Sequence, residues 1–128
     1  NLNIYCPKYY QDVYFQKLKD MNKEISLDKI NLRELNLNQM DPTDVIYTDT
    51  WFSMGDIEDS TKIEMLSKYT VNQDLMSKVN SDCIFLHCLP ANRSQEVSGE
   101  VIDGPQSYVW QEAQNRLHVQ KELLLKFL

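Results

Sequence analysis

The alternation of short apolar runs with longer amphipathic stretches is the feature that most constrains the fold of this chain. Residues 2–6 (LNIYC), 44–48 (DVIYT) and 83–87 (CIFLH) are short runs rich in β-branched and aromatic side chains, typical of buried strands. Amphipathic stretches of helical periodicity separate them. Strands that alternate with helices predict an α/β fold with a mostly parallel sheet and right-handed crossovers.

Weaker patterns predict the other elements. The helix after the first strand has one apolar face, formed by Tyr14, Leu18, Met21 and Ile25. We expect a short edge strand at 26–31, a short helix at 32–40, a helix at 60–79 that breaks near Thr70, and a strand at 107–110. A final helix at 111–127 has an apolar stripe, formed by Ala113, Leu117, Leu124 and Leu128.

Length, charge and cysteine content limit the class of protein. The chain has 128 residues, enough for one domain, and 13 basic against 19 acidic side chains give a net charge of -6. No block of Lys and Arg could neutralise a phosphate backbone, so we expect no nucleic-acid partner. No apolar run approaches the roughly 18 residues of a membrane span, so we expect no membrane partner. Three cysteines without a CxxC pair favour a reducing compartment, which predicts a cytoplasmic protein.

The sequence offers no motif for a nucleotide cofactor or a metal. Its three glycines spell neither G-x-G-x-x-G nor G-x-x-x-x-G-K. Two histidines and three scattered cysteines give no spacing for a zinc site. We therefore predict no metal and no cofactor.

Candidate binding residues follow the strand at 44–48. In parallel sheets, ligands bind beyond the carboxyl ends of the strands. Asp49 could hold a cationic amine there, or it could merely cap the next turn. Ser53, Met54 and Gly55 suit a loop that closes over a small ligand, although most Ser-x-Gly loops do not close and Met54 alone would more often be packing.

A second group of candidates follows the later strands. Cys88 can act as a thiolate if a cationic neighbour or ligand lowers its pKa. His87 points to the opposite face of the strand, which argues against a Cys-His dyad and favours a core histidine with one hydrogen bond. Arg116 could form an ion pair with Glu112 one turn earlier, or it could face an anionic group in the same crevice.

Three segments carry a resemblance to a known family, in matching order and spacing: DVIYTDTWFSMG (44–55), FLHCLP (85–90) and DGPQSYVWQEAQNRLHVQKELL (103–124). Together they resemble the carbamoyltransferases, and among them ornithine carbamoyltransferase. D-x-x-x-S-M-G and H-C-L-P are each short, but their joint occurrence at strand ends is specific. The resemblance implies a three-layer Rossmann-like domain over residues 1–128, the C-terminal, ornithine-binding half of the fold. It further implies that the domain is incomplete at its N-terminal edge, without its first strand and its partner domain.

The resemblance also implies roles for individual residues in making citrulline, a step of arginine metabolism. Asp49 would pair with the α-amino group of L-ornithine, and Ser53 and Met54 would contact its amino-acid end. Cys88 would lie by the δ-amino group and help its deprotonation. Cys88, the Leu89 carbonyl and Arg116 would contact carbamoyl phosphate. Transfer of the carbamoyl group then needs orientation and charge stabilisation but no cofactor.

The chain also departs from the family pattern. The S-T-R-T-R and H-P-x-Q motifs that cradle carbamoyl phosphate are not among these 128 residues, so we expect the isolated chain to be inactive. Full-length family members are homotrimers, but their contacts lie largely in the other half, and we predict no oligomeric state for this chain. A eukaryotic source would make the mitochondrial matrix an alternative compartment.

Two alternative functions remain open. One is another carbamoyltransferase, acting on putrescine or aspartate; Asp49 and the Ser53-Met54 loop favour an α-amino acid with a cationic side chain, and Cys88 favours ornithine over aspartate. The other is a truncated, non-catalytic paralogue kept as an interaction domain. The joint presence of Asp49, Ser53, Cys88 and Arg116 favours descent from a working site.

Overall fold

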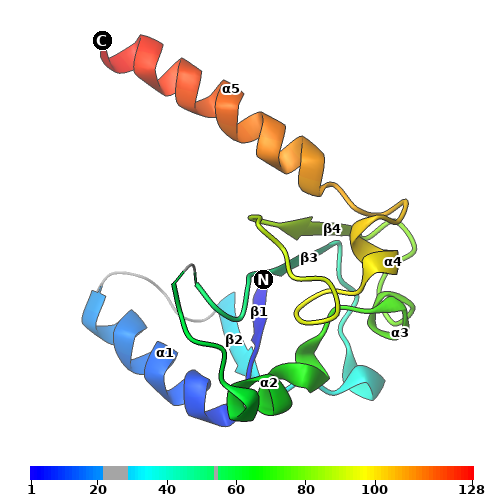
Figure 1. Ribbon diagram of the computed structural model, residues 1–128. Helices are drawn as coiled ribbons and strands as arrows, with labels where there is room; N and C mark the ends of the chain where they lie inside the picture. Colours follow the sequence, from blue (N-terminus) through cyan, green and yellow to red (C-terminus); the bar gives the residue numbers. More distant parts are fainter. Residues whose placement is uncertain (22–28, 54) are drawn as a thin grey trace.

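The computed structural model describes residues 1–21, 29–53 and 55–128, in which short strands alternate with helices (Figure 1). The strands are β1 (Leu2–Tyr5), β2 (Ile30–Arg33), β3 (Val45–Thr48) and β4 (Ile84–His87). The α-helices are α1 (Lys8–Met21), α2 (Ser60–Leu66), α3 (Gln73–Met76), α4 (Gly99–Ile102) and α5 (Val109–Phe127), and two 3-10 turns are η2 (Leu37–Gln39) and η3 (Ser67–Tyr69).

All strand pairing is parallel in the part of the chain that the structure describes, which confirms the predicted α/β class. The strands form two sheets of two strands, β1 with β2 and β3 with β4, rather than one continuous sheet. In the second sheet Val45 lies opposite Ile84 and Thr48 opposite His87, so β3 and β4 end side by side. This register brings the residues that follow the two strands to one edge.

Of the two elements predicted between residues 26 and 40, the strand is shifted along the chain and the helix is not formed. The edge strand expected at 26–31 is β2, at Ile30–Arg33, while residues 26–28 lie outside the described residues. The helix expected at 32–40 is wrong, because residues 32 and 33 pair with β1 and only the turn η2 follows. Asn36 caps that turn, accepting a hydrogen bond from Asn38 N at 3.1 Å.

The strand expected at 107–110 is also wrong. Ser107 makes a single parallel bridge to Phe85, with Tyr108 N donating to Phe85 O at 2.9 Å. Tyr108 O then accepts from Glu112 N at 2.9 Å, and this bond opens the first turn of α5. The helix therefore begins two residues earlier than the sequence pattern predicts.

The predicted break near Thr70 is confirmed, although the helical stretch ends at Met76 rather than near residue 79. Thr70 Oγ1 donates to Gln95 O at 2.7 Å, and Val71 N donates to Glu96 O at 2.9 Å. These bonds to a distant segment compete with the helical bonds. Asn72 restarts the helix as the cap of α3.

The apolar core gathers around β4. Its fully or nearly fully buried members come from β4, α3, α4, the start of α5 and the bridge between residues 71 and 97; they are Val71, Leu75, Met76, Phe85, Val97, Val101, Ile102 and Val109. On β4 the buried residues are Phe85 and His87, which share one face of the strand, so this face is the one that the core holds.

The apolar stripe of the last helix does not join this core. Figure 1 shows α5 projecting away from the body of the molecule, and Leu117 and Leu124 are 65% and 60% exposed. On α1, Tyr14 is exposed as well, while Ile25 and the side chains of Leu18 and Met21 lie outside the described residues. Within those residues no helix combines the length and apolar character that crossing a membrane requires.

Candidate functional site

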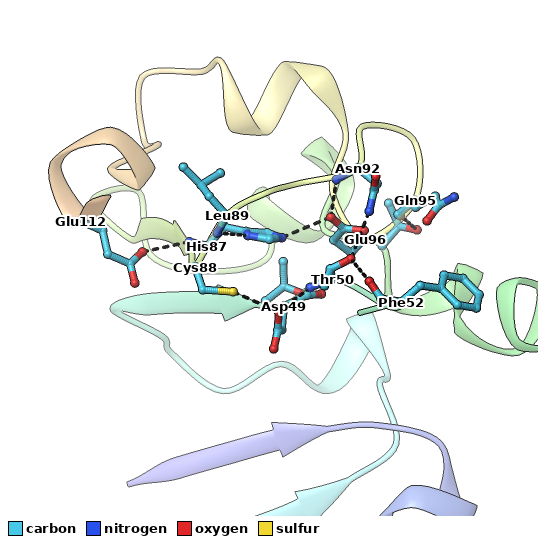
Figure 2. Close-up of polar contacts among 12 residues, drawn as sticks. Asp49, Thr50, Phe52, His87, Cys88, Leu89, Asn92, Gln95, Glu96 and Glu112 are labelled. Atoms are coloured by element: carbon cyan, nitrogen blue, oxygen red, sulfur yellow. Dashed lines mark hydrogen bonds and ion pairs between the residues drawn. The ribbon is translucent and has the colours of Figure 1, made fainter. Parts of the chain in front are cut away.

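Asp49 and Cys88 meet at the carboxyl ends of β3 and β4. Each is the first residue after its strand, and the pairing of Thr48 with His87 places them opposite one another. The Cys88 Sγ donates a hydrogen bond to Asp49 Oδ1 at 3.0 Å, as Figure 2 shows. Asp49 Oδ1 also accepts from Thr50 N at 2.7 Å, so the carboxylate shapes the next turn and faces the thiol.

Cys88 is a thiol donor in this arrangement. Burial raises the pKa of Cys88, and the hydrogen bond from its thiol to Asp49 and the charge of that carboxylate raise it further. A hydrogen bond with Tyr47 acts in the opposite direction. No cation offsets these effects among the described residues around Cys88, so the thiol keeps its proton near neutral pH.

Tyr47, on β3, adds a hydroxyl group to the polar site that Asp49 and Cys88 form. Its pKa is raised to about 12, first by desolvation of the hydroxyl, then by the hydrogen bond with Cys88 and the nearby acidic groups Glu112 and Asp49. Tyr47 and Asp49 are two residues apart, so they share one side of the extended chain. The site thus presents two carboxylates, a thiol and a hydroxyl, whose oxygen and sulfur atoms can accept hydrogen bonds from an ammonium group.

Glu112 and Arg116 do not form the ion pair that their spacing on α5 allows. Glu112 Oε2 instead accepts from the backbone of His87, with the N···O distance 3.1 Å. Arg116, one turn later, is exposed and has no ion-pair partner in the described ranges. Its guanidinium is therefore uncommitted to a protein carboxylate.

The Ser53 loop forms a turn of its own. Ser53 N donates to Asp56 Oδ2 at 2.8 Å, and Asp56 N donates back to Ser53 O at 3.0 Å. Ser53 is exposed, and the structure does not bring it against Asp49 or Cys88; Met54 lies outside the described residues. Gly55 adopts φ 93°, a left-handed conformation that glycine accepts without strain.

The side chain of His87 is buried on the face of β4 opposite to the side on which Cys88 lies, as the alternation of side chains along a strand predicts. Its ring makes two hydrogen bonds rather than the one expected, to Glu96 Oε1 at 3.2 Å and from Leu89 N at 2.9 Å. Figure 2 shows the Cys88 side chain directed to Asp49 and the His87 ring directed to Glu96. The structure therefore agrees with the absence of a Cys88-His87 dyad.

No cluster of three or more His, Cys, Asp or Glu side chains able to hold a metal ion exists within the described residues. Asp49, Cys88 and Glu112 all act as hydrogen-bond partners of protein groups. The arrangement is that of a polar site open at a sheet edge, with acidic groups beside a protonated thiol.

Comparison with known proteins gives this site its context. A family model described as aspartate/ornithine carbamoyltransferase, Asp/Orn binding domain, matches residues 1–127. The chain belongs to this carbamoyltransferase family. An ornithine carbamoyltransferase of Methanobrevibacter smithii is 45% identical over 135 aligned residues, covering 100% of this chain and 43% of the relative. Another, of Cenarchaeum symbiosum, is 57% identical across 64% of this chain and 27% of the relative.

Solved structures agree with the assignment to the carbamoyltransferases. The anabolic ornithine carbamoyltransferase of Campylobacter jejuni superposes with a TM-score of 0.77 at 37% identity, covering 97% of this chain and 41% of that one. The ornithine carbamoyltransferase of Pyrococcus furiosus superposes with a TM-score of 0.67 at 43% identity, covering 74% of this chain and 31% of that one. The Rossmann-like α/β interpretation is thereby confirmed. The chain spans about two fifths of the length of these relatives or less.

Four residues of this polar site were not predicted from the sequence. Tyr47 could have been found from its two-residue spacing to Asp49 along a strand. Thr50, Asn92 and Glu96 carry no comparable signal, because their roles depend on contacts between distant loops. Asn92 Nδ2 donates to Thr50 Oγ1 at 3.0 Å, and Glu96 is 0% exposed beside His87.

Proposed function

We propose that this chain is the ornithine-binding C-terminal domain of an ornithine carbamoyltransferase. The observation that carries the proposal is the 3.0 Å contact between Cys88 Sγ and Asp49 Oδ1 at the end of the β3-β4 pair. Family membership supports it, as do the names of the relatives and solved structures described above. The three free cysteines support a reducing compartment, and we propose the cytoplasm.

In the proposed reaction the δ-amino nitrogen of L-ornithine attacks the carbonyl carbon of carbamoyl phosphate. A C–N bond forms, the C–O bond to phosphate breaks with its electron pair leaving on phosphate, and the amine loses a proton. The products are citrulline and phosphate. No redox change occurs, so the protein needs to supply only orientation, proton transfer and charge stabilisation.

The carboxylates of Asp49 and Glu112 give the site a negative charge, which attracts the positively charged amino groups of ornithine. Asp49 is proposed to bind the α-amino group, with Ser53 and Met54 at the amino-acid end. An ammonium group that arrives beside Cys88 opposes the effect of Asp49 on the thiol pKa and favours the thiolate. Cys88 would then take part in removing a proton from the δ-amino group.

The proposed anion contacts are few. Leu89, through its carbonyl, and Cys88 would meet the carbamoyl group, and Arg116, with no ion-pair partner in the described structure, would meet the phosphate. Each charge-assisted phosphate contact contributes roughly 1.5–3 kcal/mol, and the S-T-R-T-R and H-P-x-Q motifs that would supply most of them are not in this sequence. We therefore propose that the isolated chain binds ornithine but does not turn it over.

Calorimetric titration of the 128-residue chain with L-ornithine, putrescine and L-aspartate tests the substrate class. Ornithine should bind most tightly, because it alone combines an α-amino acid end with a second amine. Tighter binding of putrescine or aspartate would assign the chain to another carbamoyltransferase. Binding of none of the three would favour a non-catalytic interaction domain.

A citrulline assay on the purified chain with both substrates tests the second part of the proposal. We expect no citrulline above the enzyme-free control. Turnover at a rate near that of a complete ornithine carbamoyltransferase, measured in parallel, would overturn this part and leave the binding assignment standing.

A further inference from the structure

His87 and Glu96 form a fully buried polar pair behind the proposed site. Both side chains are 0% exposed, and His87 Nε2 lies 3.2 Å from Glu96 Oε1. The same oxygen accepts a hydrogen bond from Asn92 N at 2.5 Å, and Glu96 Oε2 has no partner in the described part of the chain. Burying such a pair is costly compared with apolar packing, so stability alone does not account for it.

The other ring nitrogen of His87 holds the backbone next to Cys88. Leu89 N donates to His87 Nδ1 at 2.9 Å. Leu89 has φ 53°, in the left-handed region that is unfavourable for a non-glycine residue. A residue stays in that conformation only where its surroundings fix it, and the imidazole supplies the acceptor.

These two contacts define the tautomer of His87. A ring nitrogen that accepts an N–H carries no proton, so Nδ1 is bare and Nε2 carries the hydrogen that it donates to Glu96. Both nitrogens are thus occupied, and neither is free to take the proton of Cys88. A carboxylate that orients a histidine in this way fixes its tautomer and its direction.

We propose that His87 is a positioning residue for the carbamoyl transfer: held as the Nε2–H tautomer by Glu96, it fixes the left-handed Leu89 backbone and so directs the Leu89 carbonyl and the Cys88 thiol to the substrates. The inference rests on the proposed function for its substrates, but its structural part does not. It assigns to His87 a role through Leu89, not contact with the reacting atoms.

The same network reaches the loop that carries Asp49. Asn92, whose backbone binds Glu96, donates from its side chain to Thr50 Oγ1 at 3.0 Å, and Thr50 Oγ1 donates to Phe52 O at 2.9 Å. Figure 2 shows this connection running from His87 through Glu96 and Asn92 to Thr50. Glu96 therefore orients His87 on one side and joins the two loops of the site on the other.

A matched pair of variants separates positioning from simple core filling. The side-chain oxygen introduced by His87→Asn lies near the place of Nδ1 and can accept the Leu89 N–H, whereas the longer amide introduced by His87→Gln reaches the place of Nε2 and serves Glu96 instead. Three readouts apply to the 128-residue chain: ¹⁵N NMR of the wild-type imidazole, hydrogen exchange of the Leu89 amide, and the Kd for L-ornithine by calorimetry.

Positioning predicts a protonated Nε2 and a bare Nδ1 in the wild-type chain. In His87→Gln, the hydrogen-exchange rate of the Leu89 amide and the Kd for ornithine should both rise roughly tenfold. In His87→Asn, both should stay within about threefold of the wild-type values. A protonated Nδ1 in the wild-type chain would overturn the proposal by itself. The proposal can therefore be tested even if neither variant folds. Equal effects in both variants, or a larger effect in His87→Asn, also overturn it.

The outcomes keep this inference apart from the proposed function. If the wild-type chain binds no ornithine, the proposed function fails, and the tautomer and the Leu89 exchange still decide whether His87 fixes the backbone. If ornithine binds but His87→Gln leaves both Leu89 exchange and Kd unchanged, the positioning role fails and the proposed function stands.

Discussion

At the scale of single residues, Asp49 controls the chemistry of Cys88. The carboxylate accepts the thiol hydrogen at 3.0 Å and raises the pKa of Cys88. Asp49→Asn removes the charge, which lowers that pKa, increases the thiolate fraction and shifts the pH profile of alkylation to lower pH. We expect Cys88 of the Asp49→Asn chain to react with iodoacetamide at pH 8 roughly three- to tenfold faster than Cys88 of the wild-type chain. Mass spectrometry of the Cys88 peptide measures the rate.

The matched control for this prediction is Asp12→Asn, which changes the net charge equally at an exposed position on α1 paired with Lys8. It should leave Cys88 reactivity unchanged. A rate in Asp49→Asn that equals the wild-type rate, or falls below it, would contradict the contact between the thiol and the carboxylate.

The positions of site residues were predictable from the sequence only where a strand determines the side to which their side chains point. Asp49 and Cys88 follow apolar strands, and the parallel pairing of Thr48 with His87 was enough to bring them together. Glu96 could not be found in this way, because a polar residue is buried only when a distant partner such as His87 is present. Ser53 and Arg116 remain predictions, since the structure does not bring either against Cys88.

At the scale of elements, the short helix α4 depends on a close approach that only glycine allows. A Cβ at Gly104 would lie 2.5 Å from the backbone oxygen of Glu100, while a Cβ at Gly99 would meet Arg93 Cδ at an ordinary 3.8 Å. We expect Gly104→Ala to lower the free energy of unfolding by about 2 kcal/mol, because the backbone must shift. Urea denaturation measures the change.

Gly99→Ala provides the control within the same helix. Alanine is the better helix former, so this variant should be as stable as wild type or up to about 1 kcal/mol more stable. A Gly104→Ala chain no less stable than Gly99→Ala would show that residue 104 does not approach the Glu100 carbonyl closely at the end of α4.

Element boundaries were less predictable than the elements themselves. The strands β1, β3 and β4 follow from short apolar runs, as expected. Tyr108, Val109 and Trp110 have strand-forming side chains, yet α5 begins at Val109, because only Ser107 bridges to β4 before the hydrogen bond from Glu112 N to Tyr108 O starts the helix. Contacts between distant segments decided that boundary, and a local pattern does not contain them.

At the scale of the whole molecule, stability is concentrated in the core around β4 and not in the projecting helix α5 (Figure 1). Phe85 is 0% exposed and Phe127 is 79% exposed. We expect Phe85→Ala to cost about 3–5 kcal/mol and Phe127→Ala to stay within about 0.5 kcal/mol of wild type, in urea denaturation. If Phe85→Ala does not fold, Phe85→Leu should still cost about 1 kcal/mol or more. A larger loss from Phe127→Ala than from Phe85→Leu would contradict this distribution.

The central claim about the whole molecule is that its acidic sheet edge binds the amine of an amino acid through Asp49. Calorimetric titration with L-ornithine of the wild-type chain, Asp49→Asn and the charge-matched Asp12→Asn tests it most directly. Loss of one charge-assisted contact predicts a Kd roughly tenfold or more higher in Asp49→Asn and an unchanged Kd in Asp12→Asn. Equal affinity in all three chains, or no heat of binding to the wild-type chain, would contradict the claim.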